Sequence, residues 1–319
     1  MLREVYTSRP FIGYFACCST IAAVLVLGIF SIGDPLADDD VVGVEQIQNV
    51  AERRALDEAE SATTKYLSDL FPTVEVDYSI ADGEKPLTGI LFVTPLLDSG
   101  DDIENTIFNQ TSIFHQDGRT TLNLGLGYRR LVMQDLVLLG VNSFYDYEFE
   151  YDHQRASLGA EFRTSVGEIN ANYYWGLSNL RTLSSGTTER ALDGYDLEVG
   201  IPLPFINWAT FYTKVFRWHG VDNEDLDGNQ YSLKLNPPLG TGWTIEAIVS
   251  DREEGDAIKT LQVSYDFFAT KKGSEPQVAW VSTDAYRLET MEDHRFEKVR
   301  RENRIVKEET TGGFSVIGF

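Results

Sequence analysis

The chain has little sulfur and little imidazole, and these shortages exclude several kinds of chemistry. Its only cysteines, Cys17 and Cys18, are adjacent and lie in an uncharged apolar stretch near the N-terminus. If export cleaves off that stretch, the mature chain has no thiol for a disulfide, a zinc site or a nucleophile. None of the four histidines has another within metal-ligand spacing: His115, His153, His219 and His294. We therefore predict no metal site and no cofactor.

Positive charge is scarce as well. Lys and Arg number 27 against 50 Asp and Glu, which gives a formal net charge of -23 at pH 7. Binding to nucleic acid depends on a surface rich in Lys and Arg that displaces counterions. We therefore predict that nucleic acid is not a partner.

The sequence also lacks a catalytic constellation. Barrel enzymes of the outer-membrane lipase type pair a Ser and a His on one face of one strand, and no His here has a Ser two positions away. A pair formed across two strands remains open. Carboxylates concentrate in the loops, where solvated acidic surface is the ordinary explanation. We predict a protein that is not an enzyme and has no catalytic residues.

The N-terminus has the layout of an export signal. Arg3 and Arg9 precede residues 11–32, which carry no charge, and the triplet at residues 31–33 is a small-x-small cleavage site. Pro35-Leu36-Ala37 offers a second place to cut. We predict a signal peptide over residues 1–37. The alternative is an uncleaved membrane helix of about 20 residues.

The next segment has a helical period. Apolar side chains recur at spacings of three and four between Val44 and Leu70, half of them alanine, and Pro72 ends the pattern. We predict a periplasmic helical segment over residues 38–72 that acts as a solvated spacer. Close packing of the alanine stripe against a partner is the alternative.

After Pro72 the apolar residues alternate with a period of two. In residues 120–130 one face carries Leu122, Leu124, Leu126 and Tyr128, and the other carries Asn123, Gly125, Gly127 and Arg129. A soluble sheet buries its apolar face, whereas a membrane barrel turns that face to lipid and the small or polar face to a wet lumen.

Twelve runs of this kind follow one another, and most have the roughly 9 to 11 residues that a tilted strand needs to cross a bilayer. The runs span residues 73–81, 87–96, 106–115, 120–130, 136–145, 154–164, 168–177, 194–201, 208–218, 230–235, 242–250 and 258–267. We therefore predict an all-β fold over residues 73–268. It is a transmembrane antiparallel up-and-down β-barrel of about twelve strands, with short N- and C-terminal helical segments.

The connections alternate in length and charge. Long, mostly acidic loops follow the fifth, seventh, ninth and eleventh runs, and short turns follow the fourth, sixth, eighth and tenth. Outer-membrane barrels combine long outside loops with short periplasmic turns. We therefore predict that loops 178–193 and 219–229 lie outside the cell. The turn LLDSGDDIEN after the second run is longer and more acidic than this parity predicts.

Aromatic residues lie near the predicted strand ends, where amphipathic rings favour the headgroup level of a membrane. We expect a girdle formed by Tyr128, Tyr145, Tyr147, Trp175, Trp208, Trp218, Trp243 and Phe267.

The triplet His153-Gln154-Arg155 stands where a strand restarts. We interpret it as a polar strand rim paired with carboxylates such as Asp146 and Glu161, because charged pairs facing a lumen are ordinary in barrels. A ligand-binding patch is the alternative.

Four motifs together resemble a known family. LNLGLGYR at 122–129, FYDYE at 144–148, HQRASLGAE at 153–161 and DGYDLEVGIPLP at 193–204 are similar, in order and spacing, to the β-domain of the intimin and invasin family, the inverse autotransporters. The residues that carry the motif are Gly125, Gly127, Tyr128, Arg129, Phe144, Tyr145, Asp146, His153, Arg155, Gly159, Glu161, Gly194 and Asp196.

The resemblance implies a twelve-stranded barrel in a Gram-negative outer membrane, with its N-terminus in the periplasm. It also implies a linker that runs back through the pore and carries an adhesive passenger outside. Its partners would be outer-membrane lipid, the barrel assembly machinery, and a host or neighbouring-cell surface. The final run, TLQVSYDFF, resembles the closing-strand signal that the assembly machinery reads.

Only 51 residues follow Phe268 (319 minus 268), fewer than an Ig-like domain of about 100 residues needs. We therefore expect an intimin-type translocator and anchor without an encoded passenger. A passive porin is the alternative, and a soluble all-β binding protein comes third.

The C-terminal residues 269–319 form the predicted linker. Residues 286–309 mix basic and acidic side chains, which suit a charged lumen better than lipid. We predict that this segment is a helix lodged in the lumen, and the alternative is a solvated periplasmic tail.

Overall fold

The computed structural model describes residues 66–97, 103–183, 185–239, 242–252, 257–269, 280–311 and 314–318. The predicted signal peptide and most of the predicted N-terminal helix lie outside these residues. Residues 66–70 are helical, and the amide of Phe71 closes the last turn on the Leu67 carbonyl at 2.7 Å. In the described part of the chain, no helix has the length and apolar character needed to cross a membrane.

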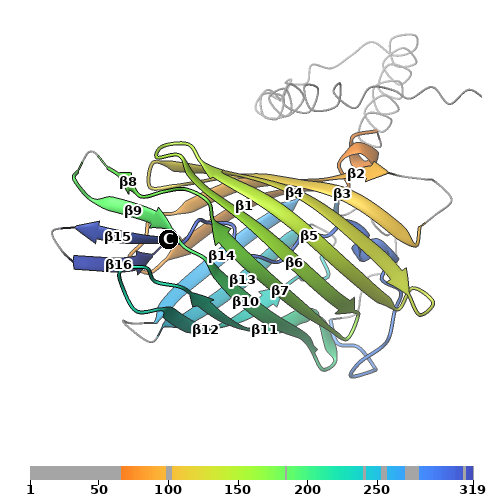
Figure 1. Ribbon diagram of the computed structural model, residues 1–319. Helices are drawn as coiled ribbons and strands as arrows, with labels where there is room; N and C mark the ends of the chain where they lie inside the picture. Colours follow the sequence, from red (N-terminus) through yellow and green to blue (C-terminus); the bar gives the residue numbers. More distant parts are fainter. Residues whose placement is uncertain are drawn as a thin grey trace, which may run out of the picture. The chain divides into compact units, whose positions relative to one another are not determined.

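Twelve antiparallel strands close into a barrel, as Figure 1 shows. They are β1 (Thr73–Ala81), β2 (Leu87–Leu97), β3 (Asn105–Gln116), β4 (Arg119–Val132), β5 (Val137–Glu148), β6 (His153–Thr164), β7 (Gly167–Gly176), β10 (Gly194–Leu203), β11 (Ile206–Trp218), β12 (Leu226–Leu235), β13 (Trp243–Arg252) and β14 (Ile258–Asp266). Each strand pairs with its neighbour in the chain, and β14 pairs with β1 to close the sheet. The predicted all-β barrel of about twelve strands is confirmed.

The alternating residues face as their chemistry requires. On β4 the inward positions are buried and the outward positions are exposed. Leu126 keeps 54% of its surface exposed, whereas Asn123, at an inward position of the same strand, keeps 0%. The apolar face therefore points outward, toward lipid, and the small or polar face points into the barrel.

The two ends of the barrel differ. One end, the short-turn rim, carries tight connections such as residues 165–166 and 204–205. The other, the long-loop rim, carries the connections 177–193 and 219–225. It also holds one tight turn, Asp117-Gly118, in which both residues have positive φ, the geometry of the two-residue hairpin turns that suit twisted strands.

A second sheet lies at the long-loop rim. It contains β8 (Arg181–Thr182) and β9 (Thr188–Ala191) from the connection between β7 and β10, together with β15 (Lys307–Thr311) and β16 (Phe314–Gly318). The strand order is β16-β15-β9-β8 (Figure 1). Short alternating segments inside polar loops give little sequence signal, and these four strands were not among the twelve predicted runs.

The C-terminal segment crosses from one rim to the other. At the short-turn rim, the Phe205 amide donates to the Ala285 carbonyl at 3.3 Å and the Met291 amide donates to the Asp135 carbonyl at 2.7 Å. The chain then passes inside the barrel and enters β15 at Lys307, at the long-loop rim. Residues 295–306 are called the plug segment below.

The prediction that residues 286–309 form a helix is wrong. The only helical turn among them is the 3₁₀ turn η2 (Glu292–Phe296), and the plug segment is otherwise irregular or extended. Mixed charges at helical spacing suggested a helix, but here side chains of the barrel supply the hydrogen-bond partners that a helix would supply internally.

Trp218 does not belong to an aromatic girdle. It is only 2% exposed and packs inside the barrel with Tyr174 and Val306. Its position at the end of β11 suggested the membrane interface, but the inward register of that strand places it in the lumen. Tyr128, Tyr145, Trp175, Trp243 and Phe267 remain exposed on the outer face, as predicted.

Candidate functional site

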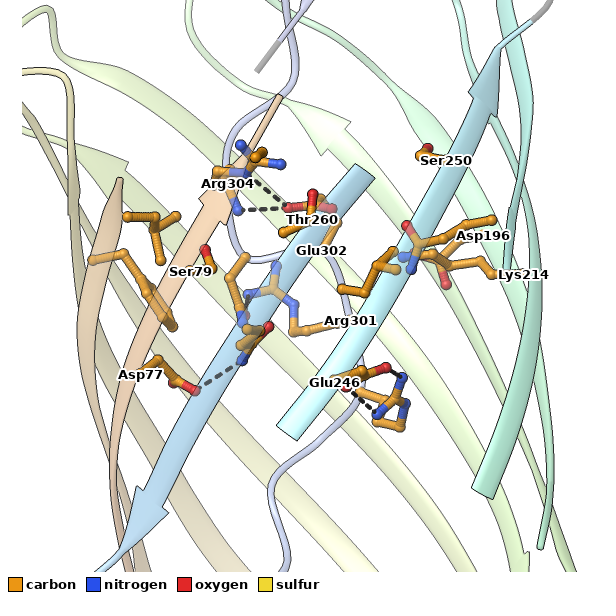
Figure 2. Close-up of a pocket in the computed structure, with 18 of the residues that line it drawn as sticks. Asp77, Ser79, Asp196, Lys214, Glu246, Ser250, Thr260, Arg301, Glu302 and Arg304 are labelled. Carbon is orange, nitrogen blue, oxygen red and sulfur yellow. Dashed lines mark hydrogen bonds and ion pairs between the residues drawn. The ribbon is translucent and has the colours of Figure 1, made fainter. Parts of the chain in front are cut away.

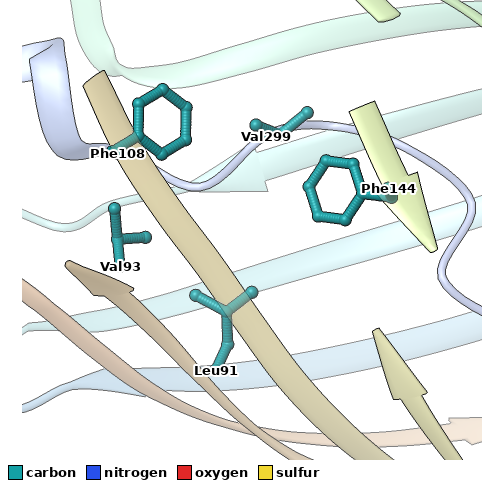
Figure 3. Close-up of a cluster of buried hydrophobic side chains, with 5 residues drawn as sticks. All are labelled: Leu91, Val93, Phe108, Phe144 and Val299. Carbon is teal, nitrogen blue, oxygen red and sulfur yellow. The ribbon is translucent and has the colours of Figure 1, made fainter. Parts of the chain in front are cut away.

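The plug segment rests on a floor of apolar residues. Val299 packs against Leu91, Val93, Phe108 and Phe144, which come from β2, β3 and β5 (Figure 3). Glycines on β4 make room for the two rings, because a Cβ at Gly125 would lie 2.1 Å from the Phe144 ring and one at Gly127 would lie 2.2 Å from the Phe108 ring. The glycines of the LNLGLGYR motif thus let the aromatic rings lie flat under the plug segment.

Arg129 holds the plug segment by its backbone. Its Nε and one terminal nitrogen donate to the Glu161 carboxylate at 2.8 and 3.0 Å. Its other terminal nitrogen donates to the carbonyls of Arg295 at 2.9 Å and Glu297 at 2.6 Å. The carboxylate therefore fixes one edge of the guanidinium while the other edge binds peptide groups.

Arg155 repeats this arrangement nearer the long-loop rim. Its Nε donates to Asp146 at 2.8 Å, and its two terminal nitrogens donate to the carbonyls of Arg304 and Glu302, each at 2.7 Å. The guanidinium also stacks over Tyr174, 4.6 Å from the ring centroid. Glu161 was a predicted partner of Arg155, but it pairs with Arg129 instead.

Uncharged side chains of β1, β3, β4 and β7 bind further peptide groups of the plug segment. The carbonyls of Phe296, Arg300 and Asn303 accept from Thr73, Asn172 and Asn123 at 2.8, 3.1 and 3.1 Å. The amides of Val299 and Glu302 donate to Gln110 and Tyr174, each at 2.8 Å.

Acidic side chains of the barrel bind the cations of the plug segment. Lys298 pairs with Glu75 and lies 3.6 Å from Asp77, both on β1. Arg300 reaches across the lumen to Glu198 on β10 at 2.5 Å and to Glu246 on β13 at 2.8 Å.

Two further cations of the segment also find acids. Arg301 pairs with Asp146 at 2.7 Å and Arg304 with Glu84 at 2.9 Å. Figure 2 shows several of these side chains around the plug segment.

A cavity of about 200 Å³ remains beside the plug segment. It is bordered by β10 to β14, by β1 to β3 and by the plug segment, with Lys214, Ser250 and Thr260 among its polar lining (Figure 2). The interior is thus filled on one side and hollow on the other.

Buried charges gather where the plug segment leaves the barrel. Arg119 donates to Glu148 at 2.8 Å and to Glu189 at 2.5 Å, Lys307 donates to Glu148 at 2.8 Å, and His153 contacts Glu189 at 3.0 Å. These five residues are called the rim cluster below. It ties β4, β5 and β6 to β9 and β15.

Glu189 is ionised in this setting. Burial raises its pKa, but hydrogen bonds from His153 and Arg119 and the charge of Lys307 outweigh burial and lower the pKa to about 2. For Glu309, next along β15, burial and the nearby Glu189 charge raise the pKa.

Within the described residues, Glu148, His153 and Glu189 place their donor atoms within 4.8 Å of one another, as metal ligands do. Both carboxylates, however, already accept hydrogen bonds from Arg119, and Glu148 accepts another from Lys307. A metal ion would have to displace these cations, so the donor set fits an ion-pair cluster better than a metal centre.

The structure brings most of the motif residues together on the inner wall. Tyr128 and Tyr145 alone among them face outward. Asp196 accepts hydrogen bonds from Asn172 at 2.8 Å and Tyr174 at 2.7 Å. Gly194 lies under the Trp218 ring and Gly159 under two asparagine amides, and in both places a Cβ would be closer than 3.0 Å to its neighbour.

Sequence reasoning missed several binding residues. Gln110, Asn172 and Tyr174 contact the plug segment backbone, and Glu189 belongs to the rim cluster. In the structure the first three lie at buried, inward positions of β3 and β7, so extending the alternation of residues 120–130 to those strands is the signal that could have found them. The pairing of Glu189 depends on the second sheet, which the sequence did not reveal.

Comparison with known proteins places the chain among outer-membrane barrels. Residues 30–303 match the family model described as inverse autotransporter, beta-domain. The inverse autotransporter adhesin YeeJ of Escherichia coli (strain K12) is 26% identical over 87% of this chain and 12% of its own length. Invasin of Yersinia enterocolitica is 28% identical over 57% of this chain and 22% of its own length. The chain therefore spans less than a quarter of either relative.

A solved structure supports the fold. A chain solved in work named "Unveiling the Mechanism Behind the in-meso Crystallization of Membrane Proteins" is 21% identical, with a TM-score of 0.60 over 75% of this chain and all of that one. The family match covers most of the sequence, and the barrel has the lipid-facing outer surface that the family requires. The chain belongs to the inverse autotransporter β-domain family, whose place is the Gram-negative outer membrane.

Proposed function

We propose that this protein is a translocator and anchor that holds a polypeptide through its lumen and presents the outer part of that polypeptide on the cell surface. The observation that carries the proposal is the path of the plug segment. It enters at the short-turn rim, is bound inside the barrel through its backbone and its cations, and leaves at the long-loop rim in the hairpin of β15 and β16.

The proposal includes a contact with another surface. The names of two relatives, an adhesin and an invasin, support a role in adhesion to a host or neighbouring cell. The contacting parts would be the loops 177–193 and 219–225 of the long-loop rim, or a passenger joined after residue 319. The outer face supports lipid as a partner, and insertion by the barrel assembly machinery is part of the same proposal.

Epitope tags on intact cells test this orientation. Tags in loop 219–225 and after residue 319 should both be labelled, and a tag in the turn 236–241 should be labelled only after the outer membrane is opened. If the loop tag is labelled and the C-terminal tag is not, the barrel is inserted as proposed but does not export. Labelling of the turn alone would reverse the topology.

A further inference from the structure

The wall formed by β1 and β3 to β7 binds the plug segment mainly through peptide groups. Arg129 and Arg155 each donate to two carbonyls, and Thr73, Asn123 and Asn172 donate to one each. Gln110 and Tyr174 accept from amides. Every polypeptide carries these carbonyl and amide groups, so such contacts place little demand on its sequence.

The donors of this wall are held in place by the barrel itself. Glu161 binds two nitrogens of Arg129, and Asp146 binds Arg155. Stacking on Phe108, 4.5 Å from the ring centroid, further restrains Arg129. The edges that bind peptide groups are therefore preorganised, independently of the side chains that the bound segment carries.

The same wall has hydrogen-bonding capacity that the plug segment does not use. Asn142 on β5 and Asn170 on β7 face inward with 4% and 1% of their surface exposed. Neither side-chain amide has a hydrogen-bond partner among the described residues. A buried amide without a partner is costly, so a bound chain in another register gains from contacting these groups.

Contacts that depend on the sequence of the plug segment come from strands on both sides of the lumen, and on the wall itself Arg301 pairs with Asp146 on β5. Lys298 meets acids on β1, and Arg300 meets acids on β10 and β13, across the lumen. These pairs fix the register of the segment. The cavity of about 200 Å³ on that side leaves room for side chains of other shapes.

We infer that this wall is a binding track for extended polypeptide of unrelated sequence, which holds an exported chain in transit. The pairs of Lys298 and Arg300 stop the chain in its final register. The role in transit rests on the proposed function, whereas recognition of the backbone does not.

Hydrogen exchange in the full-length protein tests backbone recognition directly. The measured quantity is the protection of the Val299 and Glu302 amides. One variant exchanges two cations for uncharged side chains, Lys298→Gln with Arg300→Gln, which removes their charge pairs and leaves Val299 on its apolar floor. A second variant, Arg129→Lys with Arg155→Lys, keeps the charges beside Glu161 and Asp146 but removes the fork that reaches the carbonyls. Arg217→Lys, on the outer face, is the matched control.

If the wall binds the backbone, the Val299 and Glu302 amides of the exchanged segment should keep their protection from hydrogen exchange within about threefold of the parent protein. In the wall variant, Arg129→Lys with Arg155→Lys, this protection should fall tenfold or more, roughly the effect of one or two charge-assisted hydrogen bonds. The control should match the parent protein. Loss of protection in the exchanged segment together with full protection in the wall variant would overturn the inference. Retained heat-modifiable mobility in gels shows that each variant still folds as a barrel.

Export separates the inference from the proposed function. Two reporter passengers of unrelated sequence and opposite net charge are joined after residue 319, and their appearance on the surface is timed. The wall variant should delay both by a similar factor, about tenfold. If the parent exports both and the wall variant delays neither or only one, the track has no role in transit. If the parent exports neither, the proposed function fails, and hydrogen exchange alone decides backbone recognition.

Discussion

The inward positions of the two halves of the barrel differ in how deeply they are buried. Inward positions on β4, β5 and β6 are almost all buried beneath the plug segment. On β13 and β14 most inward positions keep partial exposure, because they line the cavity instead. The motif residues that resemble the inverse autotransporters lie on β4, β5, β6 and β10. All of them except Gly194 and Asp196, which lie on β10 beside the cavity, therefore belong to the strands that bind the plug segment.

Removing the plug segment should leave the inward positions of both halves equally exposed. Deletion of residues 286–319 exposes both walls to water, and we expect a large rise in single-channel conductance in planar bilayers. Deletion of residues 307–319, which removes only the hairpin and keeps the plug segment, is the control. If the larger deletion leaves the current unchanged, the plug segment does not limit the pore and the passive porin alternative gains support.

Replacing a basic residue that binds the plug segment should lower the free energy of unfolding more than replacing a basic residue that lines the cavity. Arg155→Ala removes a buried cation from Asp146 and from two carbonyls, which should lower the free energy of unfolding by about 3 kcal/mol. Lys214→Ala, in the cavity, should cost less than about 1 kcal/mol, because Lys214 is half-buried and makes no ion pair among the described residues. Urea titration of folded mobility in gels measures both. Equal losses would mean that the two walls contribute alike.

A smaller effect is expected from Gly127→Ala. The added Cβ would meet the Phe108 ring at 2.2 Å, so the ring must leave its place under the plug segment. Overpacking of this kind costs about 1 to 3 kcal/mol. Gly167→Ala is the matched control, since its nearest neighbour is the Gly200 carbonyl oxygen at 3.4 Å. The same titration applies, and identical midpoints for the two variants would show that Phe108 moves without cost.

The smallest effect concerns acid and the rim cluster. The pKa of Glu189 is lowered from 4.5 to about 2, so its contribution to stability is complete above about pH 4.5 and declines as the pH falls toward 2. The raised pKa of Glu309 acts in the opposite sense. We expect the amides of residues 307–310 to lose protection between pH 5 and pH 3, after correction for the intrinsic exchange rate, while β4 amides do not. Glu189→Gln should flatten this pH dependence, and a persistent slope in that variant would assign the effect to another group.

Most of the barrel could be predicted because its signals are local. Alternation placed Asn123 and Arg129 inside and Leu126 outside, and loop parity identified the two rims. The conformation of the plug segment could not be predicted in this way. Its peptide groups bind Arg129, Gln110 and Asn172, which are distant in sequence, so local charge spacing wrongly indicated a helix.

The rim cluster was hidden for a similar reason. His153 and Arg155 stood out in the sequence as a polar strand rim, and Asp146 proved to be a partner of Arg155, as predicted. Glu189 and Lys307 join the cluster only because β9 and β15 pair in the second sheet. A strand of four or five residues in an acidic loop carries too few side chains for its pairing to be read from alternation.

The register of the terminal hairpin sets how the molecule would respond to pulling. Gly318 at the end of β16 lies opposite Lys307, where β15 leaves the barrel, and Phe314 lies opposite Thr311 at the turn. A tension applied beyond Gly318 would therefore separate the hairpin from its open end, one residue pair after another, as a zipper opens. The hairpin would lengthen at a lower force than the one needed to break the contacts of the arginines inside the barrel, and it would act as a compliant tether in series with a stiff anchor.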